Sequence, residues 1–311
     1  MLKKIFSRWT DGPWSAAVIL TVGVVLAFAP DAFLTMLARA FLTQWALFFG
    51  MVVLFCARKR AWWSGTAALA SGLLVLQPSL TTPGGSRTAG SVVPALKVAH
   101  MNVYQRNGDH AEVVRTALAS GADLISVQEV SGRWAEVLAD GLSADFPYHV
   151  IEPRENCYGI ALFSRVPFME QQVRYLDGNP IVDVSVSTAQ GPVRVVAVHA
   201  SSPGTYGDFE RRNRQLSDLA ALVGERPIPT AVVGDLNTVS WDQALHRLCR
   251  RSGLREGEDR PTATWPSALG LALIPIDHVL VSPALDVDTL RSFTIPGSDH
   301  RGLVAQLAFA R

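Results

Sequence analysis

The residues of this 311-residue chain that could do chemistry stand at the ends of short apolar segments. Four of them directly follow such a segment: Asn102, Glu129, His199 and Asp235. Four more stand two residues beyond a segment, or at or before the start of one: Asn237, Asp277, Asp299 and His300. If the segments are strands of mixed sheets, the first four running one way and the last two the other, all eight side chains meet at one rim.

Each of these residues alone has an ordinary explanation. Asn and Asp after a strand are commonly turn residues, a single Glu at a strand end is commonly solvated, and a lone His can be a satisfied interior residue. Together, carboxylates, amides and imidazoles at one rim indicate a site for a hard metal ion and a phosphate. Mg²⁺ (or Mn²⁺) takes one or two carboxylates and keeps several waters. The absence of a Cys ligand and of His-x-x-x-His spacing disfavours zinc.

The elements that must position these residues are short strands alternating with amphipathic helices. Strands are predicted at 96–102, 123–129, 158–164, 181–187, 193–199, 230–235, 276–282 and 303–309. Helices are predicted over 110–120, around 134–138, and over 210–223 and 241–252. The segments 181–187 and 193–199 are expected to form a hairpin through AQG. This pattern favours mixed α/β sheets covered by helices over a doubly wound parallel sheet.

The order of the motifs resembles a known family. The matching stretches are HMNV (100–103), DLISVQEV (123–130), YGIALFSR (158–165), VVAVHAS (195–201), VVGDLN (232–237), PIDHVLVS (275–282) and GSDHRGLVAQL (297–307). They are similar to the endonuclease/exonuclease/phosphatase superfamily, which includes deoxyribonuclease I, exonuclease III, inositol-polyphosphate 5-phosphatases and neutral sphingomyelinases. The resemblance covers residues 96–309 and implies a four-layer α/β sandwich, with the site at one end of two sheets.

The resemblance also implies a metal side of the site. Glu129 would be the main metal ligand, with Asn102 and Asp299 beside it. The implied cofactor is Mg²⁺ or Mn²⁺, and the implied reaction is metal-assisted hydrolysis of a phosphate ester.

The remaining site residues would handle protons and phosphate oxygens. By the resemblance, His300 contacts the scissile phosphate and Asp277 orients its ring. A carboxylate in that position holds the tautomer of the imidazole and favours its cation. Asp235 would orient or deprotonate the attacking water, while Asn237 and His199 hold phosphate oxygens or assist the leaving group.

The amino-terminal part of the chain is predicted to lie in a membrane. Three charge-free runs, each near the roughly 20 residues that cross a bilayer, predict transmembrane helices at about 13–30, 38–56 and 61–80. A signal peptide would account for the first run, but two further runs follow it. The Gly, Pro, Ser and Thr-rich stretch 81–94 then reads as a linker, and 95–311 as the catalytic domain.

The basic residues between the apolar runs predict how the chain crosses the membrane. Three of them, Lys3, Lys4 and Arg8, precede the first run, and a second basic cluster, 58–60, separates the second from the third. Because such residues favour the cytoplasmic side, we expect the catalytic domain outside a bacterial cell membrane, facing the periplasm or the extracellular space. The opposite orientation stays open.

Charge and context narrow the substrate. Residues 91–311 hold 20 Lys and Arg and 25 Asp and Glu, a net charge of −5, which suits a long nucleic acid poorly. Together with the three expected spans, the ending IPIDHVLVS…GSDHRG resembles the membrane-bound bacterial branch of the family, of the VanJ teicoplanin-resistance type. That resemblance implies a membrane phospholipid or an isoprenyl phosphate or pyrophosphate as substrate, and the bilayer as partner. No obligate protein partner is evident.

Two alternatives stay open. The first is an extracytoplasmic nuclease, which needs a basic groove. The second is a domain that binds a phospholipid without cleaving it, which predicts the loss of a site residue. The basic residues Arg211, Arg212 and Arg214 either reach lipid phosphates or form a solvated helix face.

Overall fold

The computed structural model describes residues 11–80, 94–257, 260–268 and 271–310, and the chain divides into two compact units. The helical unit comprises Met1–Thr82 with Trp241–Gln243, and the sandwich unit comprises Pro83–Ser240 with Ala244–Arg311. The predicted linker 81–94 lies outside the described residues except for Pro94, which begins the first strand.

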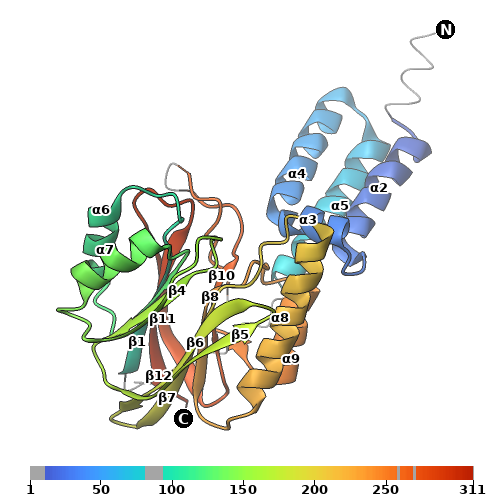
Figure 1. The fold of residues 1–311 in the computed structure, drawn as a ribbon. Helices are drawn as coiled ribbons and strands as arrows, with labels where there is room; N and C mark the ends of the chain where they lie inside the picture. Colours follow the sequence, from blue (N-terminus) through green and yellow to red (C-terminus); the bar gives the residue numbers. More distant parts are fainter. Residues whose placement is uncertain (1–10, 81–93, 258–259, 269–270, 311) are drawn as a thin grey trace. The chain divides into compact units, whose positions relative to one another are not determined.

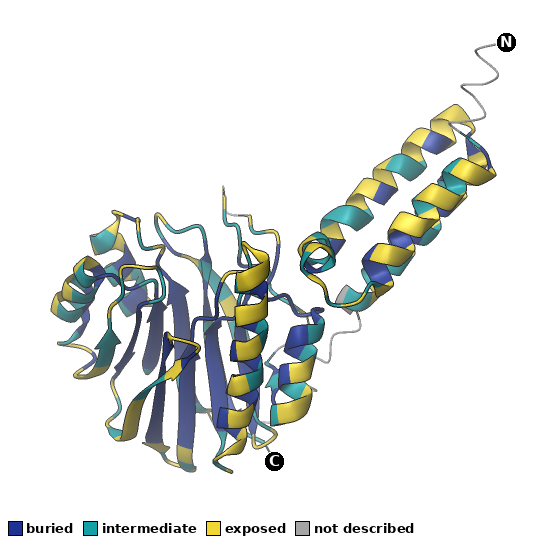
Figure 2. Ribbon diagram, turned by 45° about the vertical axis from the view of Figure 1, so that its right-hand side comes forward, coloured by how far each residue is buried: buried dark blue, intermediate teal, exposed yellow. Residues whose placement is uncertain are grey.

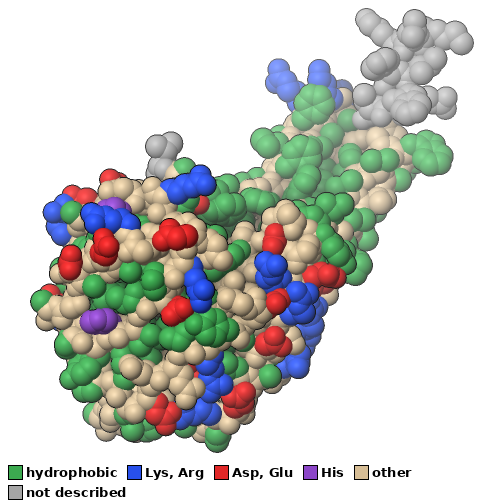
Figure 3. All heavy atoms as spheres, viewed as in Figure 1, with side chains coloured by type: hydrophobic (Ala, Val, Ile, Leu, Met, Phe, Trp, Pro, Cys, Tyr) green, Lys and Arg blue, Asp and Glu red, His purple; other side chains and the backbone are tan. Residues whose placement is uncertain are grey.

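The helical unit contains four described helices (Figure 1): α2 (Pro13–Phe28), α3 (Phe33–Ala40), α4 (Leu42–Lys59) and α5 (Trp62–Leu80). Small residues lie where helices meet. A Cβ atom on Gly23 would lie 2.4 Å from Oγ of Ser71, so only glycine allows this close approach of α2 and α5. Large apolar side chains point outward, Trp14 at 83% exposed and Leu54 at 73%. They cover this unit in Figure 3. Exposed apolar side chains gathered on one unit are typical of a surface that contacts a membrane or another protein.

The prediction of three membrane spans is not confirmed. Among the described residues, α4 alone is by itself long and apolar enough to cross a bilayer. A second span exists only if α2 and α3 act as one, and they are bent by 98° at the break between them. The run predicted as a span over 13–30 is a helix only to Phe28, and the Ser, Thr, Gly and Gln residues of α5 lower its hydropathy.

The sandwich unit contains two six-stranded mixed sheets. The first has the order β11-β12-β1-β2-β4-β3. Its strands are β1 (Pro94–Asn102), β2 (Leu124–Gln128), β3 (Tyr148–Glu152), β4 (Ile160–Ser164), β11 (Leu285–Thr294) and β12 (Arg301–Phe309). The strands β1 and β2 are parallel, and all other neighbours are antiparallel.

The second sheet has the order β5-β6-β7-β8-β10-β9. Its strands are β5 (Phe168–Leu176), β6 (Asn179–Thr188), β7 (Gly191–Val198), β8 (Thr230–Asp235), β9 (Arg255–Glu256) and β10 (Asp277–Val281). Here β7 and β8 are parallel and the others antiparallel. The predicted hairpin is confirmed, because Thr188 pairs with Gly191 across the turn between β6 and β7.

Three apolar clusters separate four layers of structure. One cluster, including Val98, Val195 and Val233, fills the space between the two sheets. A second lies between the first sheet and the helices α6 (His110–Ala119) and α7 (Gly132–Leu142). A third lies between the second sheet and the helices α8 (Tyr206–Gly224) and α9 (Gln243–Ser252). The inner strands are buried on both faces (Figure 2), which explains why they read as continuous apolar runs. The prediction of mixed sheets flanked by helices is confirmed.

Candidate active site

Strand register brings the predicted site residues to one end of the two sheets. Asp235, the last residue of β8, lies directly opposite Asp277, the first residue of antiparallel β10. In the first sheet, Asn102 at the end of β1 is level with Gln128 at the end of β2, and Glu129 follows. His300 immediately precedes β12, which runs antiparallel to β1. Because β12 ends near the carboxyl terminus, at the lower end of the sandwich in Figure 1, the site lies at the upper end.

The side chain of Asn102 joins the two halves of this site. Its Nδ2 donates to Oε1 of Glu129 (3.1 Å) and to Oδ2 of Asp235 (3.3 Å), and it lies 3.4 Å from Nε2 of His300. The backbone amide of Tyr104 donates to Oδ1 of Asn102 (3.1 Å). Asn102, a residue of the first sheet, therefore contacts Glu129 beside it, Asp235 of the second sheet and the imidazole of His300.

A buried carboxylate stands between two imidazoles. Oδ2 of Asp277 lies 2.9 Å from Nδ1 of His300, and its Oδ1 lies 2.7 Å from Nε2 of His100. The Asp277 and His100 side chains are fully buried, and that of His300 is nearly so. Both carboxylate oxygens are thus held by ring nitrogens, which fixes the orientation of the His300 ring.

This arrangement sets the charge of the pair. Burial alone would raise the pKa of Asp277, but the charge of His300 and hydrogen bonds from both imidazoles outweigh it and hold that pKa well below its usual range. Burial would lower the pKa of His300, but the facing Asp277 and its hydrogen bond raise it to about 10. His300 is therefore an imidazolium at neutral pH, with Nε2 turned toward Oδ2 of Asp235 (3.7 Å).

Asp235 has the opposite shift. Burial, followed by repulsion from Asp277, raises its pKa to about 8. Its Oδ1 accepts a hydrogen bond from the backbone amide of Asn237 (2.9 Å), so its Oδ2 is the oxygen that faces Asn102, His199 and His300. A carboxylate whose pKa lies near the working pH can accept a proton in a reaction, so Asp235 has the properties of a general base.

The two predicted phosphate contacts lie beside Asp235. Nε2 of His199 is 3.6 Å from Oδ2 of Asp235. Burial and the nearby cationic His300 lower the pKa of His199 to about 3, so this imidazole is neutral. Nδ2 of Asn237 donates to the carbonyl of Ala200 (3.0 Å), which ties the loop after β8 to the loop after β7. Two histidines of one site are thus held in opposite charge states, a pattern typical of acid–base catalysis.

The metal side suits a hard cation. The Glu129 carboxylate accepts hydrogen bonds from Asn102 and from the backbone amide of Gln105 (2.7 Å), yet burial still raises its pKa. Oδ1 of Asp299 is buried and has no hydrogen-bond partner among the described residues, whereas its Oδ2 accepts from Nε1 of Trp265 (3.0 Å). A divalent cation would neutralise both carboxylates. Glu129 and Asp299 would hold it. The third predicted ligand, Asn102, turns its Nδ2 toward Glu129, and its side-chain oxygen accepts from the amide of Tyr104.

A second group of possible metal ligands consists of residues that are predicted to handle protons or to orient them. One ligand atom each from Asp235, Asp277 and His300 lies within 4.8 Å of the others, so this buried group could also hold an ion. Both oxygens of Asp277 already accept hydrogen bonds from His100 and His300, however. Asp277 is therefore placed to orient His300, and Glu129 and Asp299 stay the predicted metal ligands.

The sequence motifs contained further site residues to which the prediction gave no role. His100 stands two residues before Asn102 and so shares its face of β1, a period-of-two signal that could have revealed it. Gln128 joins the sheets, because its Oε1 accepts from the amide of Asp235 (3.0 Å) and its Nε2 donates to the carbonyl of Val198. Gly234 has φ +149°, and a Cβ there would lie 1.9 Å from the same carbonyl oxygen, so glycine is required.

The three arginines of α8 do not form a free phosphate-binding group. Arg212 is buried, donates to the carbonyl of Asn237 (3.0 Å), and thereby supports the loop of the site. Arg211 pairs with Asp208 and Arg214 with Asp177 on the surface.

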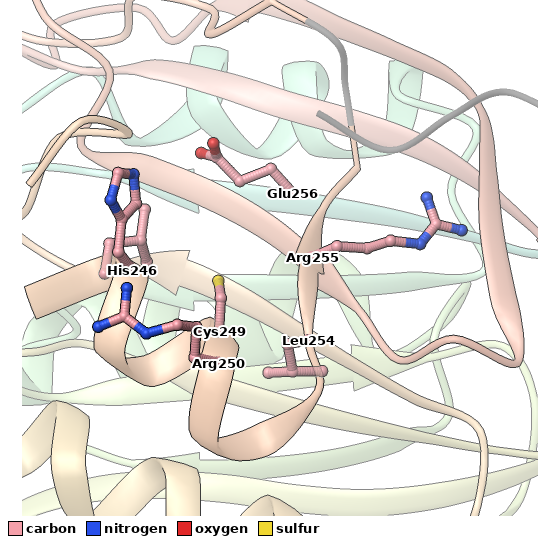
Figure 4. A pocket seen from close by; sticks show the side chains of 7 residues that line it. His246, Cys249, Arg250, Leu254, Arg255 and Glu256 are labelled. Atoms are coloured by element: carbon pink, nitrogen blue, oxygen red, sulfur yellow. The ribbon is translucent and has the colours of Figure 1, made fainter. Parts of the chain in front are cut away.

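A separate cavity of about 270 Å³ lies between α9 and β9 (Figure 4). It is lined by Leu245, His246, Cys249, Arg250, Leu254, Arg255 and Glu256. Burial raises the pKa of Cys249 to about 12, so its thiol stays protonated. None of the predicted site residues lines this cavity.

Comparison with known proteins agrees with this geometry. A model of the Endonuclease/Exonuclease/phosphatase family matches residues 99–300. The UPF0294 protein VV2535 of Vibrio vulnificus (strain YJ016) is 28% identical over 218 residues, which are 65% of this chain and 73% of the relative.

Solved structures share the fold of the sandwich unit. D. rerio TDP2 complexed with single strand DNA product superposes with a TM-score of 0.58 at 14% identity, over 68% of this chain and 98% of that one. Sphingomyelinase C from Streptomyces griseocarneus superposes with a TM-score of 0.53 at 17% identity, over 69% of this chain and 99% of that one. At these identities the likeness concerns the fold alone.

Proposed function

Because the chain belongs to the endonuclease/exonuclease/phosphatase family of phosphoester hydrolases, which are generally metal-dependent, we propose that it is a membrane-anchored enzyme that cleaves a phosphorylated lipid. The substrate class is a phosphate or pyrophosphate ester of a membrane lipid, an isoprenyl pyrophosphate or a phospholipid. The cofactor is Mg²⁺, with Mn²⁺ as the alternative. The catalytic domain faces the periplasm or the extracellular space of a bacterial cell.

The observation that carries the hydrolase is the contrast between two neighbouring groups at the end of the sheets. Asp235 has a pKa near 8 and His300 a pKa near 10, and 3.7 Å separates their facing atoms. In hydrolysis, Asp235 orients the attacking water and takes its proton. The His300 imidazolium, fixed by Asp277, stabilises the charge that develops on the phosphate oxygens. A bound divalent cation would supply further neutralisation of that charge.

Two features of the chain support a lipid substrate. The helical unit exposes large apolar side chains and contains at least one helix that could cross a bilayer, so the chain can be held at a membrane surface. The net charge of −5 over residues 91–311 weakens attraction to a long polyanion.

Product formation by the full chain in detergent tests the proposal. The substrates are undecaprenyl pyrophosphate and phosphatidylinositol phosphates, followed by release of inorganic phosphate, sphingomyelin, followed by release of phosphocholine, and single- and double-stranded DNA, followed by strand shortening, each with Mg²⁺, with Mn²⁺ and with a chelator. We expect metal-dependent product formation from a lipid and little or none from DNA. Activity on DNA alone would contradict the lipid proposal, and activity on nothing in the panel would contradict the hydrolase.

An extracytoplasmic nuclease is the second candidate. It is favoured by the shared fold with a structure that contains a single-stranded DNA product, a ligand of that other protein. The DNA arms of the same panel decide between the two.

Reporter fusions at the carboxyl terminus test the proposed orientation. An alkaline phosphatase fusion should be active and a fluorescent protein fusion dark, because the former needs an extracytoplasmic location. The reverse pattern would place the domain in the cytoplasm.

A further inference from the structure

The loop that follows β8 carries Asn237, the predicted phosphate contact, in an unusual backbone conformation. Asn237 has φ +49°, in the left-handed region that residues with a side chain adopt only rarely. Its side chain donates to the carbonyl of Ala200 (3.0 Å), so the position of its amide group depends on where the loop lies. Something in the fold must hold the loop in this conformation.

Two buried side chains from neighbouring strands hold the next residues of the loop. Nε2 of His278, in β10, lies 2.7 Å from the carbonyl oxygen of Thr238. Nδ1 of the same ring lies 3.1 Å from Oε1 of Glu256, in β9. That Oε1 also accepts a hydrogen bond from the hydroxyl of Ser240 (2.6 Å). All four residues are buried, and together they form a closed chain of hydrogen bonds that begins and ends in the loop.

The hydrogen bonds of His278 define its charge. A carbonyl oxygen and a carboxylate oxygen both accept, so each ring nitrogen must carry a hydrogen, whereas a neutral imidazole has only one. Burial would lower the pKa of His278, but the hydrogen bond and charge of Glu256 and the carbonyl of Thr238 raise it. The loop carbonyl therefore receives a charge-assisted hydrogen bond, which is stronger than one between neutral groups.

His278 acts from the face of β10 that the catalytic groups do not use. Side chains of consecutive strand residues point to opposite faces of a sheet. Asp277 points toward the first sheet, where it contacts His100 and His300. His278 points the other way, toward the loop. One strand thus holds the His300 ring through one residue and the Asn237 loop through the next.

We propose that His278, held by Glu256, is a positioning residue that places the side chain of Asn237 against the substrate phosphate by fixing the carbonyl of Thr238. This inference rests on the proposed hydrolysis, for which Asn237 is a predicted phosphate contact. His278 itself is buried behind the loop and acts on the reaction through Asn237.

A double-mutant cycle tests this route. In the wild-type background, His278→Asn keeps a donor near Nδ1 but loses the one that reaches Thr238. We expect kcat for bis(p-nitrophenyl) phosphate at saturating metal to fall by roughly 10–100-fold, because a small displacement of a substrate contact is costly. In the Asn237→Ala background the same substitution should change kcat by less than about twofold. An equal fall in both backgrounds would overturn the proposal.

Two further variants separate positioning from stability. His278→Gln places an amide donor near Nε2, within reach of Thr238, so it should recover most of the kcat that His278→Asn loses. Val281→Ala shortens a fully buried side chain at the far end of β10 and is the matched control, expected to lower the unfolding temperature while kcat stays at the wild-type value. A kcat that follows the unfolding temperature across all three variants would contradict a positioning role. If His278→Asn does not fold, Glu256→Gln, which keeps the acceptor for Ser240 and removes the charge beside His278, replaces it in the cycle.

Hydrogen exchange gives a readout that needs no activity. The amides of Leu236 and Asn237 are hydrogen-bonded to Ile276 and Asp235, so the loop should exchange slowly. By mass spectrometry of the full chain in detergent, we expect residues 236–240 to exchange at least roughly tenfold faster in H278N than in the wild type, and at the wild-type rate in V281A. Unchanged exchange in H278N would overturn the proposal. If the wild-type chain hydrolyses no substrate, the hydrolase proposal fails, and exchange still decides whether His278 holds the loop.

Discussion

Both sheets of the sandwich have a parallel pair of strands at the centre and antiparallel strands outside it. In the first sheet, β1 and β2 lead to Asn102 and Glu129; in the second, β7 and β8 lead to His199 and Asp235. In each case the site is completed by a group at the start of an antiparallel neighbour, His300 before β12 and Asp277 at the start of β10.

The two sheets hold these groups differently. Asp235 and Asp277 are paired strand residues and are buried. Glu129 and Asp299 lie beyond the strands in loops and are half-buried, and Glu129 has φ +64°, a strained value for a residue with a side chain. The second sheet thus buries its two carboxylates, while those beyond the strands of the first sheet are half-buried. We expect this division to separate proton transfer from metal binding.

The largest effect is expected at Asp235. Asp235→Asn keeps the acceptor for the amide of Asn237 but removes the proton acceptor, so kcat should fall by roughly 10²–10⁴-fold. Hydrolysis of bis(p-nitrophenyl) phosphate at saturating metal measures it. Asp140→Asn, on the exposed face of α7, is the control and should keep full activity. If excess metal restored D235N, Asp235 would belong to the metal side and the division would be wrong.

Glu129→Gln should raise the metal requirement, in contrast to Asp235→Asn, which should lower kcat even at saturating metal. Because the amide is a weaker ligand for a hard cation, the Mg²⁺ concentration for half-maximal activity should rise by roughly 10–100-fold, and high Mg²⁺ should restore much of kcat. A metal titration of activity measures this. Unchanged metal dependence together with a loss of kcat would show that Glu129 does not bind the ion.

His100→Ala removes a hydrogen bond that joins the sheets. Its Nε2 contacts the buried Asp277 at 2.7 Å, and a lost bond to a charged buried group costs about 1.5–3 kcal/mol, so we expect kcat to fall by roughly tenfold or more. His100→Gln, which retains a donor, should recover most of this. Thermal unfolding of both variants separates a loss of activity from a loss of folding. Wild-type activity in a folded H100A would mean that His300 alone suffices to fix Asp277.

The smallest effect is in the pH dependence of the wild type. Asp235 acts as a base only when deprotonated, so activity should rise with pH through a value at or below about 8, because a bound cation lowers this pKa. His300 acts only when protonated, so activity should fall with pH through about 10. A profile of kcat against pH measures both limbs. The acid limb should disappear in D235N, and its persistence there would assign it to another group.

The strands that the sequence pattern does not predict are the four sheet edges: β3, β5, β9 and β11. The eight predicted strands are the inner ones. Inner strands are covered on both faces and read as apolar runs, such as TAVVGD in β8. Edge strands carry exposed polar residues, as FMEQQVRYL in β5 does, or are as short as the two residues of β9, so apolar pattern alone does not reveal them.

As with the strands, the sequence predicts part of the candidate site and leaves part of it out. All eight predicted residues lie at one end of the sandwich, because chemically active residues at strand ends leave a clear sequence signal. His100 and Gln128 were missed because a buried imidazole or amide inside a strand resembles any satisfied core residue until its partner on the other sheet is known.

Local pattern and motif order are enough to predict the family, the alternation of inner strands and helices, and the set of side chains at the strand ends. The charge states, in contrast, depend on which groups the fold brings into contact. His199 and His300 are both histidines at strand ends, yet the first is neutral and the second is a cation. The difference arises because Asp277, from a distant segment, bonds directly to the ring of His300, while burial beside that cation keeps His199 uncharged.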